Sequence, residues 1–385
     1  MPIKKITLSI SDNSKLLLNR KARQNAFMAI ERARCLETLI IDDGLEVAGV
    51  TSWLGYKEHL NLIRHQDRAK SMDHISVAYY LSGVIKNCPK LRHVELRNVH
   101  HISKDYLGTL DSETAKKIKE AKKKWHETNG NSMWLIALAL QCKNLETLII
   151  EDLDNLTKAA LATLLSERKD TLKCLRISGN SISGDCLKHL PDCTRLEKLE
   201  ISGAYNLGVS GFEIISKMKN LTSLELSFAT MNDADGEDTG LRSTHLIQLF
   251  ANKNMKFLEK LSLAGSDLVD SRGGVGERAI RTIALNCPRL KYIDLYKGQL
   301  IPDKLFGYLI EKLQNLSYLS VRKCYEVEVE YLMKAVTKSQ SPCLKINTFQ
   351  GIITWKSGWL VGRFDFWKNG EESMEANLRD MRRMF

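Results

Sequence analysis

The stretch CPRLKYIDL, residues 287–295, contains the pattern on which the fold depends. Its apolar residues Leu290, Ile293 and Leu295 are spaced as L-x-x-L-x-L, and the last two point to the same face of a strand because they are two positions apart. The same spacing occurs ten times along the chain. The first residues of the ten copies are Ile3, Leu36, Leu91, Leu145, Leu172, Leu196, Leu221, Leu258, Leu290 and Leu316, and a weaker copy lies near Leu344 and Ile346.

The distance between successive copies indicates the class of repeat. Leu172 follows Leu145 by 27 residues, and Leu196 follows Leu172 by 24 residues. Steps of this size lie in the range of roughly 20–29 residues that is typical of leucine-rich repeats. The steps from Leu36 to Leu91 and from Leu91 to Leu145 are 55 and 54 residues, so we expect insertions or degenerate repeats there.

Between the strand segments, the apolar residues follow a helical period. Helices are predicted over residues 158–165, 211–218, 277–286, 304–313 and 328–336. One strand and one helix cannot bury their apolar faces alone, whereas a stack of such units forms a continuous core. The predicted fold is therefore an α/β leucine-rich-repeat solenoid (a horseshoe), with parallel strands on the concave face and helices on the convex face.

The domain organisation follows from where the repeats are regular. We expect the solenoid over residues 1–350, with insertions near 42–90, 98–141 and 228–245. The first insertion is expected to contain a helix over 73–86, and the third an exposed acidic loop. Residues 351–385 are rich in aromatic side chains and are expected to form a C-terminal cap with a terminal helix over 371–385, because a solenoid needs to cover its last apolar face.

Cysteines recur at one position of the repeat. Cys88, Cys142, Cys193 and Cys287 each stand three residues before the first leucine, and Lys169 is the one residue that breaks the apolar character of this position. We interpret the position as a small buried site at a helix end, where cysteine acts as a compact apolar residue. The chain has no CxxC motif and no zinc-ligand spacing, so neither a metal nor a cofactor is expected.

The C-P-x-L-x-x-L-x-L segments, together with Cys324 just past a strand, resemble the cysteine-containing subclass of leucine-rich repeats that is typical of F-box/leucine-rich-repeat proteins. Residues 172–201 and 287–324 match best. The resemblance implies a substrate-recognition or adaptor component of an SCF-type ubiquitin ligase, with the repeats holding the substrate. The first strand segment starts at Ile3 and no F-box-like segment is visible, so assembly with a cullin ligase would need an F-box upstream. The alternative is a ligase-independent scaffold or inhibitor of a protein partner.

Residues between and just after the core positions of each strand are expected to face a protein partner on the concave face. Tyrosine and arginine dominate interface hot spots, which favours the late repeats. The alternative is that tyrosines on neighbouring strands only cover each other. The candidate contact residues are Tyr292, Asp294, Tyr296, Tyr318, Arg322, Arg176, Glu200 and Glu225, and Ser320 is expected on the same surface.

Basic residues give the chain a net charge of +11, and many of them lie in one run. Lys116, Lys119, Lys122 and Lys123 belong to this run, within a predicted helix of the second insertion. The run is either a solvated helix face or a docking patch for an acidic surface. It has no interleaved aromatic residues, so nucleic acid is not favoured as a partner.

No set of residues predicts a reaction. The segment RGGVG, residues 272–276, lacks both GxGxxG and the phosphate-binding lysine, so we expect no enzymatic activity and no catalytic residues. The longest apolar run, Met133–Leu140, is too short to span a bilayer, and the N-terminal segment has no signal-peptide core. We therefore expect a cytoplasmic or nuclear protein without a membrane partner.

Overall fold

The structure is a computed structural model, and most strands and helices of the repeats are described in it. The described residues are 3–9, 33–42, 84–97, 112–113, 116–117, 119–120, 133–151, 156–178, 182–203, 207–227, 243–264, 275–295, 303–321, 329–348, 351–356 and 359–364. The chain divides into two compact units, Met1–Leu172 and Lys173–Phe385.

The described part of the first unit contains four parallel strands, each at a predicted strand segment. They pair in chain order, with Ile6 opposite Leu39, Leu39 opposite Val94 and Val94 opposite Leu148. Equivalent apolar positions are therefore stacked directly on one another. The elements are β1 (Lys5–Ser9), β2 (Thr38–Asp42), β3 (His93–Arg97), β4 (Thr147–Ile150), α5 (Met133–Gln141) and α6 (Lys158–Glu167).

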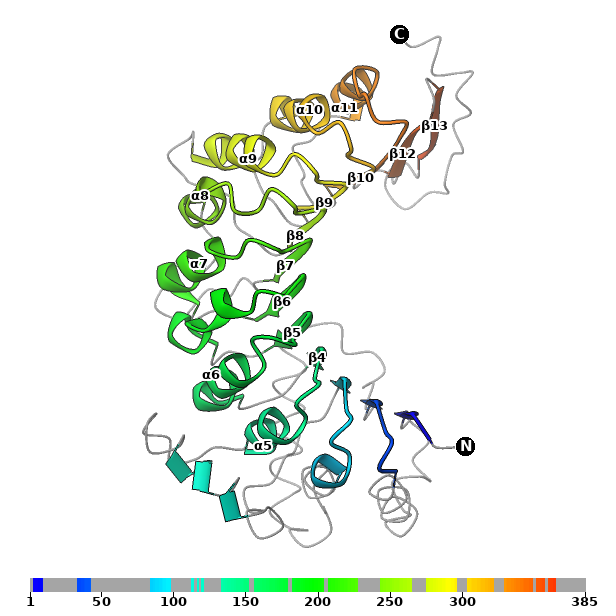
Figure 1. Ribbon diagram of the computed structural model, residues 1–385. Coiled ribbons are helices and arrows are strands. Elements are labelled where there is room, and N and C mark those ends of the chain that lie inside the picture. The colour runs from blue at the N-terminus through cyan, green and yellow to red at the C-terminus, as the bar shows by residue number, and fades with distance from the viewer. Residues whose placement is uncertain are drawn as a thin grey trace, which may run out of the picture. The chain divides into compact units, whose positions relative to one another are not determined.

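The described part of the second unit has the same pattern over seven parallel strands, which an antiparallel hairpin follows. Figure 1 shows its α-helices stacked along one side of the strands. The parallel strands are β5 (Cys174–Ser178), β6 (Lys198–Ser202), β7 (Ser223–Ser227), β8 (Lys260–Ala264), β9 (Tyr292–Asp294), β10 (Tyr318–Ser320) and β11 (Cys343–Asn347). The helices are η1 (Gly184–Leu187), η2 (Leu190–Asp192), α7 (Gly208–Ser216), α8 (Ser243–Ala251), α9 (Val275–Asn286), α10 (Asp303–Lys312) and α11 (Val329–Val336).

The core lies between the strands and the helices, as a leucine-rich-repeat solenoid requires. Leu199, Leu224 and Leu261 are in register on β6, β7 and β8, and each is 1% exposed or less. Each repeat buries the same positions against its neighbours, so the core is continuous along the unit. The five helices predicted from the apolar period are all present, as α6, α7, α9, α10 and α11.

The cysteine position is the buried site that the sequence predicts. Cys88, Cys142, Cys193 and Cys287 are each 1% exposed or less. The backbone N–H of the leucine three residues later donates to the cysteine carbonyl, as Leu91 does to Cys88 at 3.2 Å. Burial raises the pKa of Cys142 and that of Cys287 to about 12, so these thiols stay protonated and behave as apolar groups.

At the cysteine position, the structure corrects the assignment of Lys169 as the one residue that is not apolar. The repeat that starts at Leu172 has one additional residue in its turn, so Arg168 rather than Lys169 occupies the buried position. Leu172 N–H donates to the Arg168 carbonyl at 2.9 Å, and the Arg168 side chain donates through Nη1 to the Cys142 carbonyl at 3.4 Å. Arg168 is 8% exposed and burial lowers its pKa, whereas Lys169 is exposed.

The predicted insertions are described only in part. Residues 84–87 are helical and overlap the end of the helix predicted over 73–86, and 112–113, 116–117 and 119–120 are helical pieces of the second insertion. The predicted acidic loop at 232–239 and the predicted terminal helix at 371–385 lie outside the described residues. Helix α5 belongs to the core, since Leu135, Ala137 and Leu138 are fully buried.

The chain after the last parallel strand reverses direction twice. β12 (Gly351–Lys356) and β13 (Trp359–Phe364) form an antiparallel hairpin, and β12 pairs with β11. Ile353 lies opposite Ile346, and both are fully buried. The hairpin therefore extends the sheet where the parallel repeats end. Within the described part of the chain, no helix has both the length and the apolar character needed to cross a membrane.

Candidate protein-interaction surface

The face of the sheet opposite the helices carries two rows of side chains in the second unit, and we call this the strand face. The first row is Lys198, Ser223, Lys260, Tyr292, Tyr318 and Lys345, which are in register on β6 to β11. The second row is Arg176, Glu200, Glu225, Ser262, Asp294, Ser320 and Asn347, on β5 to β11. Neighbouring strands are about 4.8 Å apart, so adjacent members of a row are close enough to interact.

Five of these residues form a continuous chain of contacts, which we call the tyrosine ladder: Glu225, Lys260, Tyr292, Tyr318 and Asn347. Lys260 Nζ donates to Glu225 Oε1 at 2.7 Å and lies 5.2 Å from the centroid of the Tyr292 ring. The Tyr292 and Tyr318 rings stack with centroids 4.5 Å apart and an interplanar angle of 4°. Asn347 Nδ2 donates to the Tyr318 hydroxyl at 3.3 Å. The ladder thus connects β7 to β11.

The environment of Tyr292 keeps its hydroxyl neutral. Partial burial raises the pKa of Tyr292 to about 12, and the nearby Asp294, Tyr318 and Glu225 act in the same direction. Both tyrosine rings are half-buried, because stacking covers one face of each ring. The two tyrosines therefore cover each other over their stacked faces, while the remainder of each ring is partly exposed.

Charges on the strand face follow the order positive, negative, negative, positive. Glu200 and Glu225 are in register on adjacent strands, an arrangement that is unfavourable by itself. Arg176 forms an ion pair with Glu200, and Lys260 forms one with Glu225. The two cations offset the repulsion between the carboxylates, so this part of the surface is largely neutralised from within.

The structure brings most of the predicted contact residues together and shows where the prediction was incomplete. Arg176 and Glu200 are paired, and Glu225, Tyr292, Asp294 and Tyr318 all lie in the two rows. Tyr296 and Arg322 lie outside the described residues. The contact role of all these residues stays a prediction.

Ser320 corrects one expectation. It was expected on the contact surface, but it is 3% exposed, because its short side chain stands between Asp294 and Asn347. Lys260 and Asn347 are ladder residues that the sequence interpretation missed. The repeat register alone could have identified Lys260, which occupies the same place in its segment as Tyr292 does in the next.

The first unit has a different strand face. Arg97 forms an ion pair with Glu95, and its Nε lies 3.5 Å from Glu151 Oε2. His93 Nε2 lies 3.4 Å from the other oxygen of Glu95, which is only 8% exposed. Strands β1 to β4 contain no Phe, Tyr or Trp. This face therefore offers hydrogen bonds and charge without aromatic area.

The predicted lysine docking patch is described at two of its four positions. Lys116 and Lys119 are exposed residues of helical pieces, and the neighbouring Lys117 lies 3.2 Å from Glu113, one helical turn away. Lys122 and Lys123 lie outside the described residues. The docking role of this run stays a prediction. Elsewhere in the described part of the chain, no group of three or more His, Cys, Asp or Glu side chains is placed to hold a metal ion.

No protein-family model matches this chain, and no curated protein matches it in sequence. Among solved structures, it is similar to the leucine-rich-repeat-containing protein LegL7 from Legionella pneumophila, with 12% identity, 93% of this chain and 92% of the other covered, and a TM-score of 0.41. It is also similar to internalin C2 from Listeria monocytogenes, with 14% identity, 60% and 91% covered, and a TM-score of 0.33.

A third similar structure is a chain of the Rad7 and Elc1 complex in yeast, with 14% identity, 84% of this chain and 96% of the other covered, and a TM-score of 0.30. These similarities concern the fold alone. The assignment of leucine-rich repeats rests on the strand register and on the rows of buried leucines described above.

Proposed function

We propose that this chain is a protein-binding scaffold and that the tyrosine ladder is the centre of its contact surface. The observation that carries the proposal is the unbroken series of contacts from Glu225 to Asn347 across five strands. The ladder joins two half-buried aromatic rings to a polar rim of Lys260, Asp294 and Asn347. Aromatic anchors surrounded by polar groups are typical of interface hot spots.

The contacts within the ladder favour binding because they order it in advance. A partner that binds a mobile side chain loses about 0.5–1.5 kcal/mol for each such side chain that it immobilises. Here Lys260 is held by Glu225, and Tyr318 is held by its stack on Tyr292 and by Asn347. Much of that ordering cost is therefore met during folding.

For the finer role, we propose a substrate-recognition or adaptor component of an SCF-type ubiquitin ligase, in the cytoplasm or nucleus and without catalysis by the chain itself. The support is the resemblance of the C-P-x-L segments to the repeats of F-box/leucine-rich-repeat proteins, together with the burial of Cys88, Cys142, Cys193 and Cys287. A ligase-independent scaffold or inhibitor of a protein partner is the second candidate.

Paired substitutions test the contact surface. Proteins labelled by proximity to the wild-type chain are compared with those labelled by the double variant Tyr292→Ser and Tyr318→Ser. The control is Tyr331→Ser, because Tyr331 is 37% exposed on α11, among the helices. We expect one or more partners to be lost with the double variant and kept with the control. An unchanged partner list in the double variant, with the fold confirmed by circular dichroism, contradicts the proposed surface.

The ligase role is tested separately. Cullin-ligase subunits should co-purify with the wild-type chain, and the abundance of the partner bound at the tyrosine ladder should rise when the chain is removed from cells. Absence of the ligase subunits argues against direct assembly. Partner abundance that stays constant favours the ligase-independent scaffold.

A further inference from the structure

The turns that lead into β6, β7, β8 and β9 each carry a basic side chain close to the first leucine of the strand segment. In the second unit these are Arg195, Lys219, Lys256 and Arg289, which we call the basic turn row. Each stands one or two residues before the first leucine of its strand segment, and all four are exposed. In the first unit, Lys90, Lys143 and Lys169 occupy the same turns and are also exposed. The turn before β10 has Gln314 and Asn315 at these places, so the row ends at Arg289, and it is separate from the strand face.

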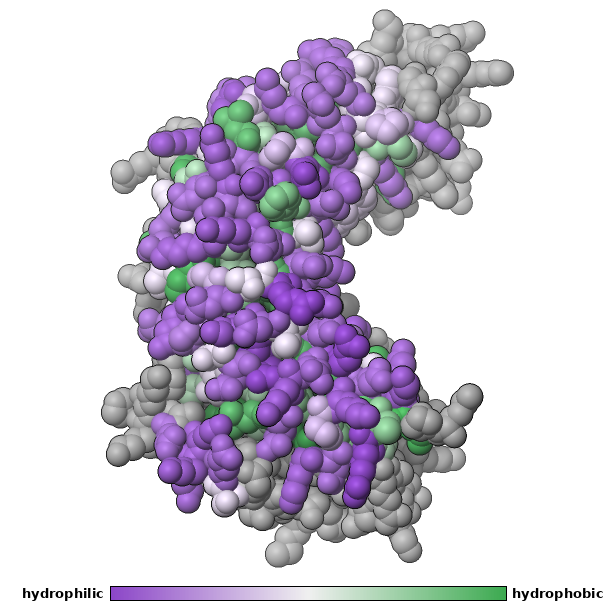
Figure 2. All heavy atoms as spheres, viewed as in Figure 1, coloured by the Kyte–Doolittle hydropathy of each residue, from purple (hydrophilic) through white to green (hydrophobic). Residues whose placement is uncertain are grey.

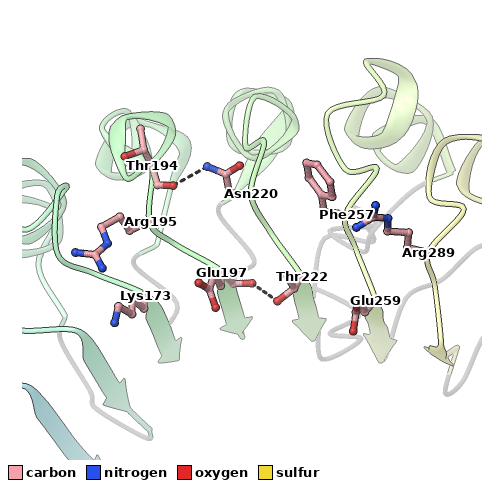
Figure 3. A pocket seen from close by; sticks show the side chains of 9 residues that line it. All are labelled: Lys173, Thr194, Arg195, Glu197, Asn220, Thr222, Phe257, Glu259 and Arg289. Carbon is pink, nitrogen blue, oxygen red and sulfur yellow. Dashed lines mark hydrogen bonds between the residues drawn. The ribbon is translucent and has the colours of Figure 1, made fainter.

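A hollow of about 520 Å³ opens beside this row. Figure 3 shows Asn220 and Thr222 in its middle, with Arg195 and Glu197 on one side and Phe257 with Glu259 on the other. Asn220 Nδ2 donates to the Thr194 carbonyl at 2.6 Å, and the Thr222 hydroxyl donates to the Glu197 carbonyl at 3.1 Å. These bonds hold the two short side chains against the preceding repeat, so the hollow is a formed feature of the surface.

Phe257, which lines the hollow, contacts two cations of the row. Lys256 Nζ lies 5.0 Å from its ring centroid, and the Arg289 guanidinium carbon lies 4.9 Å from it. Both distances fall within the range of a cation–π interaction, which holds the cation beside the ring without neutralising its charge. Of these two cations, Arg289 lines the hollow, so its positive group is held there before any ligand is bound.

The cations of the row differ from those of the strand face in their pairing. Among the residues that the structure describes, no ion pair involves Arg195, Lys219, Lys256 or Arg289. Successive members of the row have the same sign, so they cannot neutralise one another as the strand-face charges do. Their positive potential is available to an external ligand.

We propose that the basic turn row and its hollow bind an acidic segment of a partner protein in an extended conformation. Successive repeats are about 4.8 Å apart, so the row from Arg195 to Arg289 extends over roughly 14 Å. In an extended peptide, side chains on one side recur about every 6.6 Å. Acidic residues at three alternate positions would therefore match the length of the row.

The acidic residues of the hollow favour a peptide over nucleic acid. Glu197 and Glu259 line the same hollow as Arg195 and Arg289. A polynucleotide has a negative charge at every nucleotide, so its backbone would meet both carboxylates. A peptide has N–H groups and uncharged side chains at its intervening positions, and these can face the carboxylates. Phe257 is the single aromatic side chain among the lining residues, and both of its cation contacts compete with base stacking.

The test uses fluorescence anisotropy with a labelled peptide of alternating Glu and Ser, about twelve residues long so that it extends beyond the row. The full chain is compared with the double variant Arg195→Glu and Arg289→Glu. The matched control is Arg278→Glu with Lys312→Glu, which changes the charge equally at exposed positions of α9 and α10. The milder pair Arg195→Ser and Arg289→Ser covers the case in which charge reversal disturbs folding, as judged by circular dichroism.

We expect the turn-row double variant to weaken peptide binding by roughly tenfold and the control pair to leave it within about twofold. Raising the ionic strength should weaken wild-type binding, because the contacts are exposed charges. Absence of binding to the wild type, or equal weakening by both pairs, overturns the proposal. If single-stranded oligothymidylate binds more tightly than the acidic peptide, and this binding depends on Arg195 and Arg289, the proposal is also overturned, in favour of nucleic acid. Tyr292→Ser should leave peptide binding unchanged, which separates this result from the proposed function.

Discussion

The strand face and the basic turn row are built from the same repeats, yet their charges are arranged in opposite ways. On the strand face, Arg176, Glu200, Glu225 and Lys260 succeed one another on neighbouring strands and pair with each other. On the turns, one cation follows another from Arg195 to Arg289. A stack of repeats brings equivalent positions within about 4.8 Å of each other, so a change of residue along the stack can neutralise charge, whereas repetition accumulates it.

Because their charges are arranged differently, the two surfaces would bind partners through different forces. The tyrosine ladder offers aromatic area with its charges already paired, so its contacts depend on the burial of Tyr292 and Tyr318 and respond weakly to salt. The basic turn row offers exposed charge with no ion pair among the described residues, and the effect of such charge is screened by salt. Figure 2 shows that hydrophilic side chains predominate on the face in view and that apolar ones form small separate areas.

The largest effect is expected from a core substitution that destabilises the repeats, because both surfaces depend on the same buried leucines. Leu224 is fully buried between Leu199 and Leu261. We expect Leu224→Ala to lower the free energy of unfolding by about 2–5 kcal/mol, through lost apolar burial and the cavity left behind. Urea denaturation followed by circular dichroism measures this. Ser223→Ala is the control on the same strand, and an equal effect of both substitutions would contradict the assignment of the core.

A charge reversal at Lys260 should break the strand face alone. Lys260→Glu would place a carboxylate beside that of Glu225 and remove the cation from the Tyr292 ring. We expect a loss of about 1 kcal/mol in the free energy of unfolding and weaker binding of the protein partner. Acidic-peptide binding at the turn row should not change.

Exchanging the two charges tests whether the effect comes from the ion pair between Lys260 and Glu225. The double variant Lys260→Glu with Glu225→Lys should regain part of the lost stability, because it restores an opposite pair on the two strands. A double-mutant cycle in urea denaturation measures the coupling. A coupling free energy of zero would show that the ion pair does not organise the ladder.

A substitution at Phe257 should affect the turn row alone and by a smaller amount. Phe257→Leu keeps apolar volume and removes the aromatic ring that lies beside Lys256 and Arg289. We expect acidic-peptide affinity to fall by roughly threefold, since an exposed cation–π contact is worth about 0.5–1 kcal/mol. Anisotropy titration measures the change. A variant with full peptide affinity would show that the ring does not position the cations.

The smallest effect is a change in titration on the strand face. The pKa of Tyr292 is raised from 10.0 to about 12 in the folded protein, chiefly by burial. The protonated form is therefore favoured by folding, so its stabilising contribution is complete below pH 10 and is lost as the pH rises through about 12. Absorbance titration of tyrosinate should show a late component that Tyr292→Phe removes. Identical titration curves for the two proteins would contradict the proposed environment.

The sequence by itself determined the repeat, its strands and its buried positions. Every expected strand segment, from Ile3 to the weaker copy at Leu344, coincides with a strand, because a spacing of two places side chains on one face whatever their neighbours are. The burial of the cysteine position also followed from its regular place before each leucine. The place of a residue in the repeat also assigned Tyr292, Tyr318, Glu200 and Glu225 to the strand face in advance.

Only the tertiary structure decided which side chains contact one another. Lys260 pairs with Glu225, 35 residues earlier, and Asn347 bonds to Tyr318, 29 residues earlier, so neither contact follows from local spacing. The one-residue shift that buries Arg168 depends on how its turn packs against Cys142. The hollow beside the turn row exists because short side chains in one repeat stand between longer ones in its neighbours. Periodicity assigns each residue to a face, whereas contacts between repeats depend on register and side-chain length.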